Sequence, residues 1–470
     1  MNYKILSFSN ISLNNKGNLY LNNGSRLRPV SLEEAKKLGI DSLTANHLQH
    51  FFKTPFTSIS YISGGRELER FTTHPSSFYP GSPFDVFSAV KTYLETSAVI
   101  FPRFYLYPSS ACNSKCIICP FRFRHQNPFY IPLETMQGII DYMHGQTPRP
   151  KTLSAIISGD GEPSLHPDFK KFLLYMSEKD IRMFLSSSLI LPGSTAKDKI
   201  NVIADTVSML TMSIKGLSPE AYHKYQGVDS FSRVMNNMKT LVNRLNNQNR
   251  RQEALLGVAT LILPENTGHY VEMVRRFVEL GIDYVYLNVV EPSYKQWGIT
   301  FSETLKQQTI TELNALKEFN NSGTVIRFST DIFQGTTENS VYFDANNRQN
   351  TDICGSALWN PLFMSDGKHT DMIACRSSDK FLNADFSFGK TNKGQDLSTL
   401  VSDENIKRVM ANTSKCFNCR VERQVKLFDD LINIERTYDF SGEFVINFAP
   451  NVLATKGGAL VFENTFRKNR

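Results

Sequence analysis

The sequence predicts an α/β protein whose centre is a partial, TIM-like (β/α)6 barrel. Short apolar runs of strand character alternate with segments of helical period from about residue 100 to residue 325. Polar and Gly-rich segments follow these runs directly, as ligand-binding loops do at the carboxyl ends of parallel strands. Strands separated by helices in this way form a parallel sheet, and six repeats indicate an open or partial barrel.

Each of the six β/α units can be located along the chain. Residues 153–158, for example, form a buried apolar run, and residues 133–144 before it carry apolar side chains at helical spacing. The expected strands are 103–107, 153–158, 182–186, 207–213, 255–263 and 284–290. The expected helices are 133–144, 168–178, 196–204, 231–246, 269–280 and 303–319.

Composition limits the classes of function. The chain has 470 residues and a formal net charge of +7, which suit two or three domains with a mildly basic surface. The basic residues are scattered, so we expect no nucleic-acid partner. The first ten residues lack a basic region followed by an apolar core, and no run of roughly 20 apolar residues occurs. We therefore expect a cytoplasmic protein without a membrane partner.

The seven cysteines fall into two groups, and the first comprises Cys112, Cys116 and Cys119. Three thiolates on one short loop can bind three corners of an iron–sulfur cubane and leave the fourth iron without a protein ligand. A zinc site is the alternative, but structural zinc needs four ligands, and His125 is the only nearby candidate for the fourth. In a reducing compartment, grouped cysteines bind metal more often than they form disulfides.

One helix and one strand after this loop comes Gly159-Asp-Gly-Glu-Pro163, a turn whose backbone can approach a ligand closely. Together with Cys-x3-Cys-x2-Cys and the apolar Ile118 before the last cysteine, this segment resembles the radical S-adenosylmethionine (SAM) superfamily. The resemblance implies a [4Fe-4S] cluster, SAM as cofactor and a six-unit barrel. It also implies that the turn binds the amino group of SAM, through Asp160, Gly161, Glu162 and Pro163.

Two strand ends depart from that resemblance. Ser186-Ser-Ser188 stands where Thr-Asn-Gly is common in the family, and Ser213-Ile-Lys215-Gly where Ser-Ile-Asp-Gly is common. The hydroxyls of Ser186 and Ser213 can still reach the ribose or carboxylate of SAM, although both residues can also simply end strands. Because Lys215 stands in place of the family's Asp, this position lacks a hydrogen-bond acceptor and has a positive charge on the side of the substrate.

The second group of cysteines comprises Cys354, Cys375, Cys416 and Cys419. Four thiolates make a complete ligand set, which suits zinc or a fully ligated iron–sulfur cluster. Downstream of a radical core, and with Phe388-Gly389 before the closing Cys-x2-Cys, the pattern resembles the single-cluster form of the SPASM/Twitch domain. The resemblance implies one auxiliary [4Fe-4S] cluster, which would take up the electron left by the substrate radical and make the reaction an oxidation.

These readings divide the chain into four parts. Residues 100–325 are the radical SAM core and residues 326–435 the SPASM/Twitch-like auxiliary domain, while residues 436–470 form a tail that can close over it. Residues 1–99 are an α+β extension, either a leader-peptide-binding module or a packing extension. In the outer parts we expect strands at 7–21, 57–62, 444–448 and 460–462, and helices at 31–38 and 84–94.

The resemblance implies an oxidoreductase that cleaves SAM to a 5′-deoxyadenosyl radical. We expect a ribosomally made precursor peptide (RiPP) as substrate, modified by crosslinking of side chains, and flavodoxin or ferredoxin as electron donor. A dehydrogenase or epimerase acting on a small molecule such as an aminoglycoside is one alternative, and a non-enzymatic iron–sulfur or zinc scaffold is another. No acid–base residue is assigned, and the candidates by position alone are Lys215, Tyr294, Lys295, Trp297 and Trp359.

Overall fold

The structure, a computed structural model, describes the central part of the chain and several strands near its ends. The described residues are 99–119, 128–146, 153–191, 193–248, 250, 254–290, 297–322, 324–329, 361–365, 369–373, 387–391 and 397–413 in the central part. Near the ends they are 2–5, 11–13, 19–22, 27–29, 57–63, 66–72, 96, 443–448, 452–456 and 459–460.

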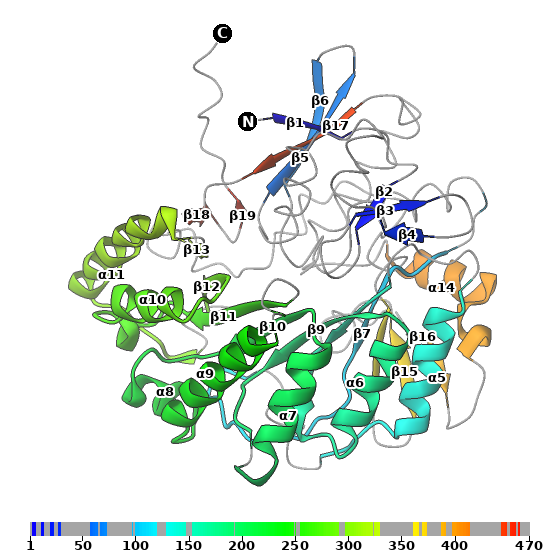
Figure 1. Cartoon of the computed structure of the whole chain (residues 1–470), viewed down its shortest axis with the longest axis horizontal. Helices are drawn as coiled ribbons and strands as arrows, with labels where there is room; N and C mark the ends of the chain where they lie inside the picture. The colour runs from blue at the N-terminus through cyan, green and yellow to red at the C-terminus, as the bar shows by residue number, and fades with distance from the viewer. Residues whose placement is uncertain are drawn as a thin grey trace.

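Six parallel strands form the centre of the molecule, in the order of the chain (Figure 1). They are β7 (Arg103–Leu106), β8 (Ser154–Ile157), β9 (Arg182–Ser187), β10 (Met209–Ser213), β11 (Leu255–Leu261) and β12 (Tyr284–Asn288). All six expected strands are present, and each begins and ends within two residues of the prediction. The α/β class and the parallel sheet are therefore confirmed.

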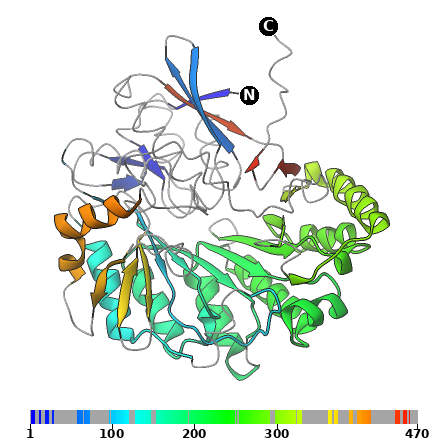
Figure 2. The ribbon, with the colours of Figure 1, turned by 180° about the vertical axis from the view of Figure 1, so that it is seen from behind.

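Helices between the strands cover the outer side of the sheet (Figures 1 and 2). They are α5 (Leu133–His144), α6 (Phe169–Glu178), α7 (Gly193–Thr206), α8 (Pro219–Gln226), α9 (Phe231–Asn247), α10 (Tyr270–Glu279) and α11 (Glu303–Ala315). Short 3-10 helices add η2 (Pro163–Leu165), η3 (Pro264–Asn266) and η5 (Leu316–Asn321). Of the α-helices between these strands, α8 was not expected. Among the described residues, no helix combines the length and apolar character needed to span a bilayer.

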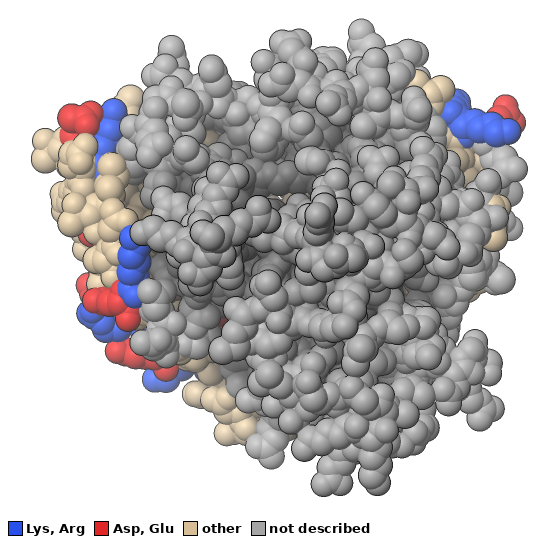
Figure 3. All heavy atoms as spheres, turned by 90° about the horizontal axis from the view of Figure 1, so that it is seen from above, with Lys and Arg blue, Asp and Glu red and all other residues tan. Residues whose placement is uncertain are grey.

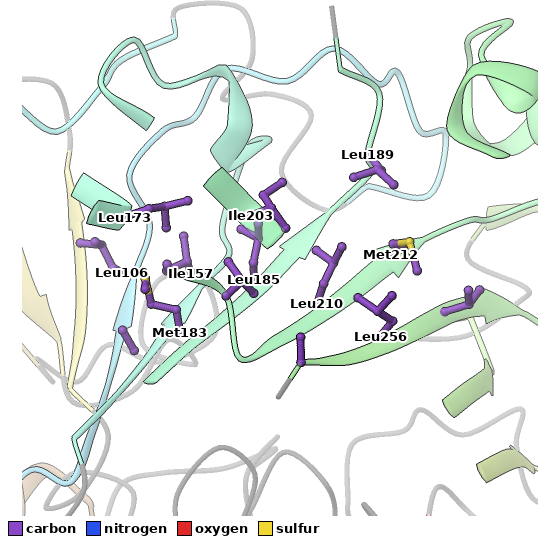
Figure 4. Close-up of a cluster of buried hydrophobic side chains, with 14 of the residues drawn as sticks. Leu106, Ile157, Leu173, Met183, Leu185, Leu189, Ile203, Leu210, Met212 and Leu256 are labelled. Carbon is purple, nitrogen blue, oxygen red and sulfur yellow. The ribbon is translucent and has the colours of Figure 1, made fainter. Parts of the chain in front are cut away.

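Alternate side chains of the strands face the helices and form the main core (Figure 4). Leu185 of β9 and Leu210 of β10 are buried there together with Leu173 of α6 and Ile203 of α7. Fully burying side chains of this kind contributes about 1.5–3 kcal/mol each. The core thus fixes the register of the sheet and, with it, the position along the sheet at which each strand ends and its loop begins.

The other face of the strands is more polar and aromatic. One register row on this face runs from Ser186 through Thr211 and Gly257 to Tyr284. The Tyr284 hydroxyl lies 2.6 Å from Oγ1 of Thr211, two strands away. A Cβ at Gly257 would overlap the Tyr284 ring, so only glycine lets this ring cross the inner face. The side chains of this register row therefore cover the inner face of the sheet at the position of Thr211 and Gly257.

The sheet extends beyond the six expected strands. On one side, β13 (Val325–Ser329) pairs in parallel with β12, and β18 (Val452–Lys456) pairs with β13 and β19 (Ala459–Leu460). On the other side, β14 (Leu362–Ser365) pairs in parallel with β7, followed by β15 (Thr370–Ile373) and β16 (Ser387–Thr391). Strands from residues 326–435 therefore extend the core sheet beyond β7, and strands from residues 436–470 extend it beyond β13. The four domain limits stay predictions.

The strands near the two ends of the chain pair with each other. β17 (Glu443–Phe448) lies between β1 (Asn2–Ile5) and β5 (Thr57–Ser63), and β6 (Arg66–Thr72) completes this antiparallel sheet. Strand β17 of the tail thus pairs with strands of the N-terminal region, and closure of the tail over an auxiliary domain stays a prediction. A second small sheet comprises β2 (Ile11–Leu13), β3 (Leu19–Asn22) and β4 (Leu27–Pro29).

After β16 the chain continues into η8 (Leu397–Val401) and α14 (Asp403–Thr413). The expected helices at 31–38 and 84–94 lie outside the described residues, as do Cys354, Cys375, Cys416 and Cys419. On the described surface, basic and acidic side chains are interleaved (Figure 3). Arg275 of α10, for example, pairs with Glu318 at 2.8 Å.

Candidate functional site

The candidate site begins in the loop that follows β7, residues 107–119, here called the cysteine loop. Cys112, Cys116 and Cys119 are half-buried, and none forms a disulfide. The pKa of the Cys112 thiol is raised to about 12, chiefly by burial, and the charges of Glu162, Cys116 and Cys119 contribute to the rise. The three sulfurs therefore lie within electrostatic reach of one another. Thiolates in this position need a cation, and iron ions supply one.

The carboxyl end of α8 is hydrogen-bonded to the cysteine loop. The main-chain N–H of Lys115 donates to the carbonyl of Gln226 at 2.9 Å, and that of Ile117 to the carbonyl of Tyr225 at 3.3 Å. These are the last residues of α8, which ends at Gly227 with a φ of 74°. A Cβ at Gly227 would stand 2.5 Å from the carbonyl oxygen of Lys115. The glycine ends the helix and also makes room for the cysteine loop.

The Gly turn, residues 159–162 after β8, packs against the cysteine loop from another side. The N–H of Glu162 donates to the carbonyl of Ala111 at 2.7 Å. A Cβ at Gly161 would lie 2.6 Å from the carbonyl carbon of Ser110, so the two backbones touch. Gly159 has a φ of 142°, which favours glycine, and Asp160 is buried. The predicted turn therefore lies directly beside the first cysteine.

The carboxylate of Glu162 is buried and receives four hydrogen bonds. Oε1 accepts from the Ser164 N–H at 3.2 Å and from the Ser187 hydroxyl at 2.8 Å. Oε2 accepts from the N–H and the hydroxyl of Ser188, at 2.7 and 2.8 Å. Lys199 of α7 donates to the Ser164 carbonyl at 2.5 Å and lies within electrostatic reach of Glu162. Ser187 and Ser188 thus bond this carboxylate, and the SAM contact predicted for Ser186 stays a prediction.

The loop after β9, residues 187–191, is here called the β9 exit loop. It contains Leu189, a buried non-glycine residue with a φ of 55°. The side chain of Asn113, within the cysteine loop, donates to the Ile190 carbonyl at 2.5 Å. Asn237 of α9 donates to the Leu189 carbonyl at 3.0 Å. A strained loop is therefore held from both sides, and one of its partners stands beside Cys112.

The remaining predicted residues lie at the ends of β9 and β10. Ser186 and Ser213 are half-exposed, and neither hydroxyl makes a side-chain hydrogen bond within the described residues. Lys215 follows β10, and its positive charge lowers the pKa of Cys116 against the larger effect of burial. Asn266 donates to the Lys215 carbonyl at 3.1 Å and fixes this loop. Lys215 is thus the cation of the described site that acts on a cysteine.

Beside the third cysteine lies a small apolar cluster. Ile118 packs against it, as does the half-buried Trp297. Its buried members are Tyr225, Leu261, Leu263, Val290 and Ile299. Trp297, a candidate by position for acid–base chemistry, packs against this cluster, and its role in the reaction stays untested. Tyr294, Lys295 and Trp359 lie outside the described residues.

The donor set suits a cluster better than a single metal ion. Within the described residues, no group of three His, Cys, Asp or Glu side chains converges on one ion position, as a single zinc ion would need. A cubane needs no such convergence, because each thiolate binds a different iron. Three thiols on one loop, held by α8 and by the Gly turn, could each bind a different iron of such a cluster. His125 lies outside the described residues.

One comparison with known proteins, that with family models, covers this part of the chain. Residues 106–278 match the Radical SAM superfamily, a range that includes the cysteine loop, the Gly turn and the β9 exit loop. A search of curated proteins gave no significant match.

Several solved structures are similar in fold. One is SuiB from Streptococcus suis bound to the precursor peptide SuiA, with 15% identity, 90% of this chain and 94% of that chain covered, and a TM-score of 0.48. Another is anSMEcpe with bound AdoMet and Cp18Cys peptide, with 17% identity, 69% and 87% covered, and a TM-score of 0.43. A third is methylornithine synthase, PylB, with 15% identity, 53% and 71% covered, and a TM-score of 0.33.

Proposed function

With a Radical SAM superfamily domain at residues 106–278, we propose that this chain cleaves SAM reductively and uses the resulting radical to oxidise a peptide. The observation that carries the proposal is the meeting of three loops at one edge of the sheet. The cysteine loop, the Gly turn and the β9 exit loop are hydrogen-bonded to one another. In parallel α/β sheets, this carboxyl edge is where cofactors and substrates bind.

Cys112, Cys116 and Cys119 would hold a [4Fe-4S] cluster. When bound, the cluster supplies one electron to SAM, which then yields methionine and a 5′-deoxyadenosyl radical. Three protein ligands leave one iron for the amino and carboxylate groups of SAM. Lys215, whose charge already reaches Cys116, would offset the negative charge of the thiolates and of a nearby carboxylate.

The surroundings of the cysteine loop support chemistry that must be shielded from water. Ile118 and Trp297 pack on the apolar cluster beside the third cysteine. On the inner face, the Tyr284 ring crosses Gly257 and closes one level of the sheet. Ser186 belongs to the same register row, and Ser213 lies two residues beyond Thr211 at the end of β10. Both would offer hydroxyls to the ribose or carboxylate of SAM. Such packing would keep water away from a radical formed here.

Cys354, Cys375, Cys416 and Cys419 would hold the auxiliary [4Fe-4S] cluster of a SPASM/Twitch-like domain. Support comes from the cysteine count, because three ligands for the first cluster and four for the second use all seven cysteines. A closed cluster accepts an electron without binding SAM, which suits an oxidation. The residues before the core suit a precursor peptide as substrate, with crosslinking of its side chains as the reaction. Flavodoxin or ferredoxin would serve as the electron donor.

The release of 5′-deoxyadenosine tests the first part of the proposal. Anaerobically reconstituted protein, reduced with dithionite, is incubated with SAM, and the products are separated by chromatography. We expect 5′-deoxyadenosine from the wild type and none from Cys116→Ser. About eight iron and eight sulfide ions per chain are expected for two clusters, and about four with bound zinc would reject the auxiliary cluster. Absence of 5′-deoxyadenosine in fully loaded protein would reject the radical enzyme.

The substrate is tested separately. Short reading frames beside the gene are made as peptides and incubated with the loaded enzyme, SAM and reductant. A peptide that loses two hydrogens, with new linked fragments in tandem mass spectrometry, supports crosslinking. Oxidation of a small-molecule alcohol with no change in any of the peptides would reject the peptide and favour the small-molecule dehydrogenase.

A further inference from the structure

Glu162, one of the two acidic residues of the Gly turn, has a carboxylate whose acceptor positions are all in use. We infer that Ser187 and Ser188 are positioning residues for SAM, and that they act by holding the carboxylate of Glu162. Glu162 then fixes the β9 exit loop and is not the acceptor for the amino group of SAM. The inference rests on the proposed function, because it concerns how the same site binds SAM.

The first argument is the number of donors. A carboxylate has about four lone-pair positions, two on each oxygen. Two donors reach Oε1 of Glu162, from Ser164 and Ser187, and two reach Oε2, both from Ser188. An ammonium group that approached Glu162 would have to displace one of these donors. The displaced donor would be buried, because Ser164, Ser187 and Ser188 are all buried, and an unpaired buried donor costs about 1–3 kcal/mol.

The second argument is the direction of the serine protons. The Ser187 hydroxyl accepts from the N–H of Leu189 at 2.9 Å, and the Ser188 hydroxyl accepts from the N–H of Ile190 at 3.4 Å. Each hydroxyl has one proton, and both protons point to Glu162. Neither serine therefore has a proton left for SAM. Their geometry is set by their own loop on one side and by the carboxylate on the other.

The third argument is the path from Glu162 to the cluster ligands. The β9 exit loop, which Glu162 holds, includes the strained Leu189. The Ile190 carbonyl receives the side chain of Asn113, the residue after Cys112. Loss of the carboxylate would free a strained loop and loosen this contact. The effect would reach the cysteine loop without any contact between Glu162 and SAM.

The orientation of Glu162 agrees with this role. Its main-chain N–H faces the cysteine loop and bonds the Ala111 carbonyl, whereas its side chain runs to the β9 exit loop. The backbones touch at Gly161. Other acceptors of the Gly turn, its main-chain carbonyls among them, are then the partners for the amino group of SAM.

The test compares two ligands on the reconstituted, oxidised protein. One is SAM, and the other is an S-adenosyl analogue in which hydrogen replaces the amino group. Dissociation constants are measured by anaerobic equilibrium dialysis for the wild type, Glu162→Gln and the double variant Ser187→Ala/Ser188→Ala. Thr240→Ala is the matched control, because it removes a hydroxyl that bonds a carbonyl on the exposed face of α9.

We expect both site variants to bind SAM about tenfold more weakly or worse, and Thr240→Ala to bind it as the wild type does. The ratio of the two dissociation constants should stay within about twofold of the wild-type ratio in every variant. Adding the serine substitutions to Glu162→Gln should change the affinity by no more than about twofold, because the three residues act as one unit.

Three results would overturn the inference. In the first, Glu162→Gln alone brings the ratio close to one, which makes Glu162 the partner of the amino group. In the second, the site variants bind SAM like the wild type. The third is a wild type that binds no SAM, which removes the proposed function and the inference with it. Glu162→Gln keeps the shape of the side chain and decides the question if the double variant does not fold.

Discussion

Replacing Gly161 by alanine tests how closely the Gly turn packs on the cysteine loop. The added Cβ would lie 2.6 Å from the carbonyl carbon of Ser110 and 2.8 Å from the carbonyl oxygen of Ser109. An ordinary van der Waals contact begins at 3.4 Å, so the first of these atoms must retreat by about 0.8 Å. Both neighbours are backbone, which cannot move aside as the end of a flexible side chain can.

Overpacking of this kind costs about 1–3 kcal/mol. We expect Gly161→Ala to lower the free energy of unfolding of the metal-free protein by about that amount, measured by urea denaturation followed by circular dichroism. The shift also moves the cysteine loop, so the reconstituted variant should retain less iron at equal protein concentration. The matched control is Gly138→Ala in the middle of α5, where an added Cβ meets nothing within 4 Å. This control should raise the stability by roughly 0.5–1 kcal/mol.

The reasoning is refuted if Gly161→Ala unfolds at the same urea concentration as the wild type and retains the same iron. A loss of stability without a loss of iron would also contradict it in part, because the turn would then pack on the loop without shaping the cluster ligands.

The remaining predictions concern the support of the site. Gly227→Ala and Gly268→Ala both place a Cβ at positive φ, which costs about 1–2 kcal/mol. Because only the Cβ at position 227 meets Lys115, only Gly227→Ala should retain less iron after reconstitution. Equal iron in the two variants would show that α8 does not support the cysteine loop. Burial lowers the pKa of His166, whose ring accepts from the Asp168 N–H at 3.0 Å, so the unfolded state takes up the proton first as the pH falls. The stability that the neutral His166 contributes is therefore present above the usual pKa of 6.5 and is lost as the pH falls below it. The urea midpoint of His166→Gln should drop less between pH 7.5 and 5.5 than the midpoint of the wild type. Equal drops would contradict this role of His166.

The strands of the core were predictable because each buries its alternate side chains under a helix. Residues 209–213, for example, place Leu210 and Met212 in the main core, and that apolar pattern is visible in the sequence. The edge strands were not predictable for the opposite reason. β13 carries the inward Arg327 and is not followed by a helix within the described residues. Nothing local distinguishes such a strand from the end of a domain.

Helix α8 was missed although its boundaries have clear signals. Ser218 caps its first turn by accepting from the Ala221 N–H at 3.1 Å, Pro219 follows, and Gly227 ends the helix. The helix is short and mostly polar, so its apolar period is weak. Capping residues alone would have found it.

The candidate site was predictable where the chemistry needs particular residue types close together in sequence. The cysteine loop and the Gly turn are of this kind. The partnership of Glu162 with Ser187 and Ser188 was not, because the strand end that meets this carboxylate depends on the order of the strands in the sheet. Three serines in a row were the available signal, but a sequence does not show which hydroxyl has a buried partner.

The most direct test of the central claim is the electron paramagnetic resonance spectrum of the reduced protein before and after the addition of SAM. If Cys112, Cys116 and Cys119 hold a cluster with one open iron, SAM must change the signal of that cluster. The wild type should show this change, and Cys116→Ser should not. A cluster signal in the wild type that SAM leaves unaltered would contradict the account.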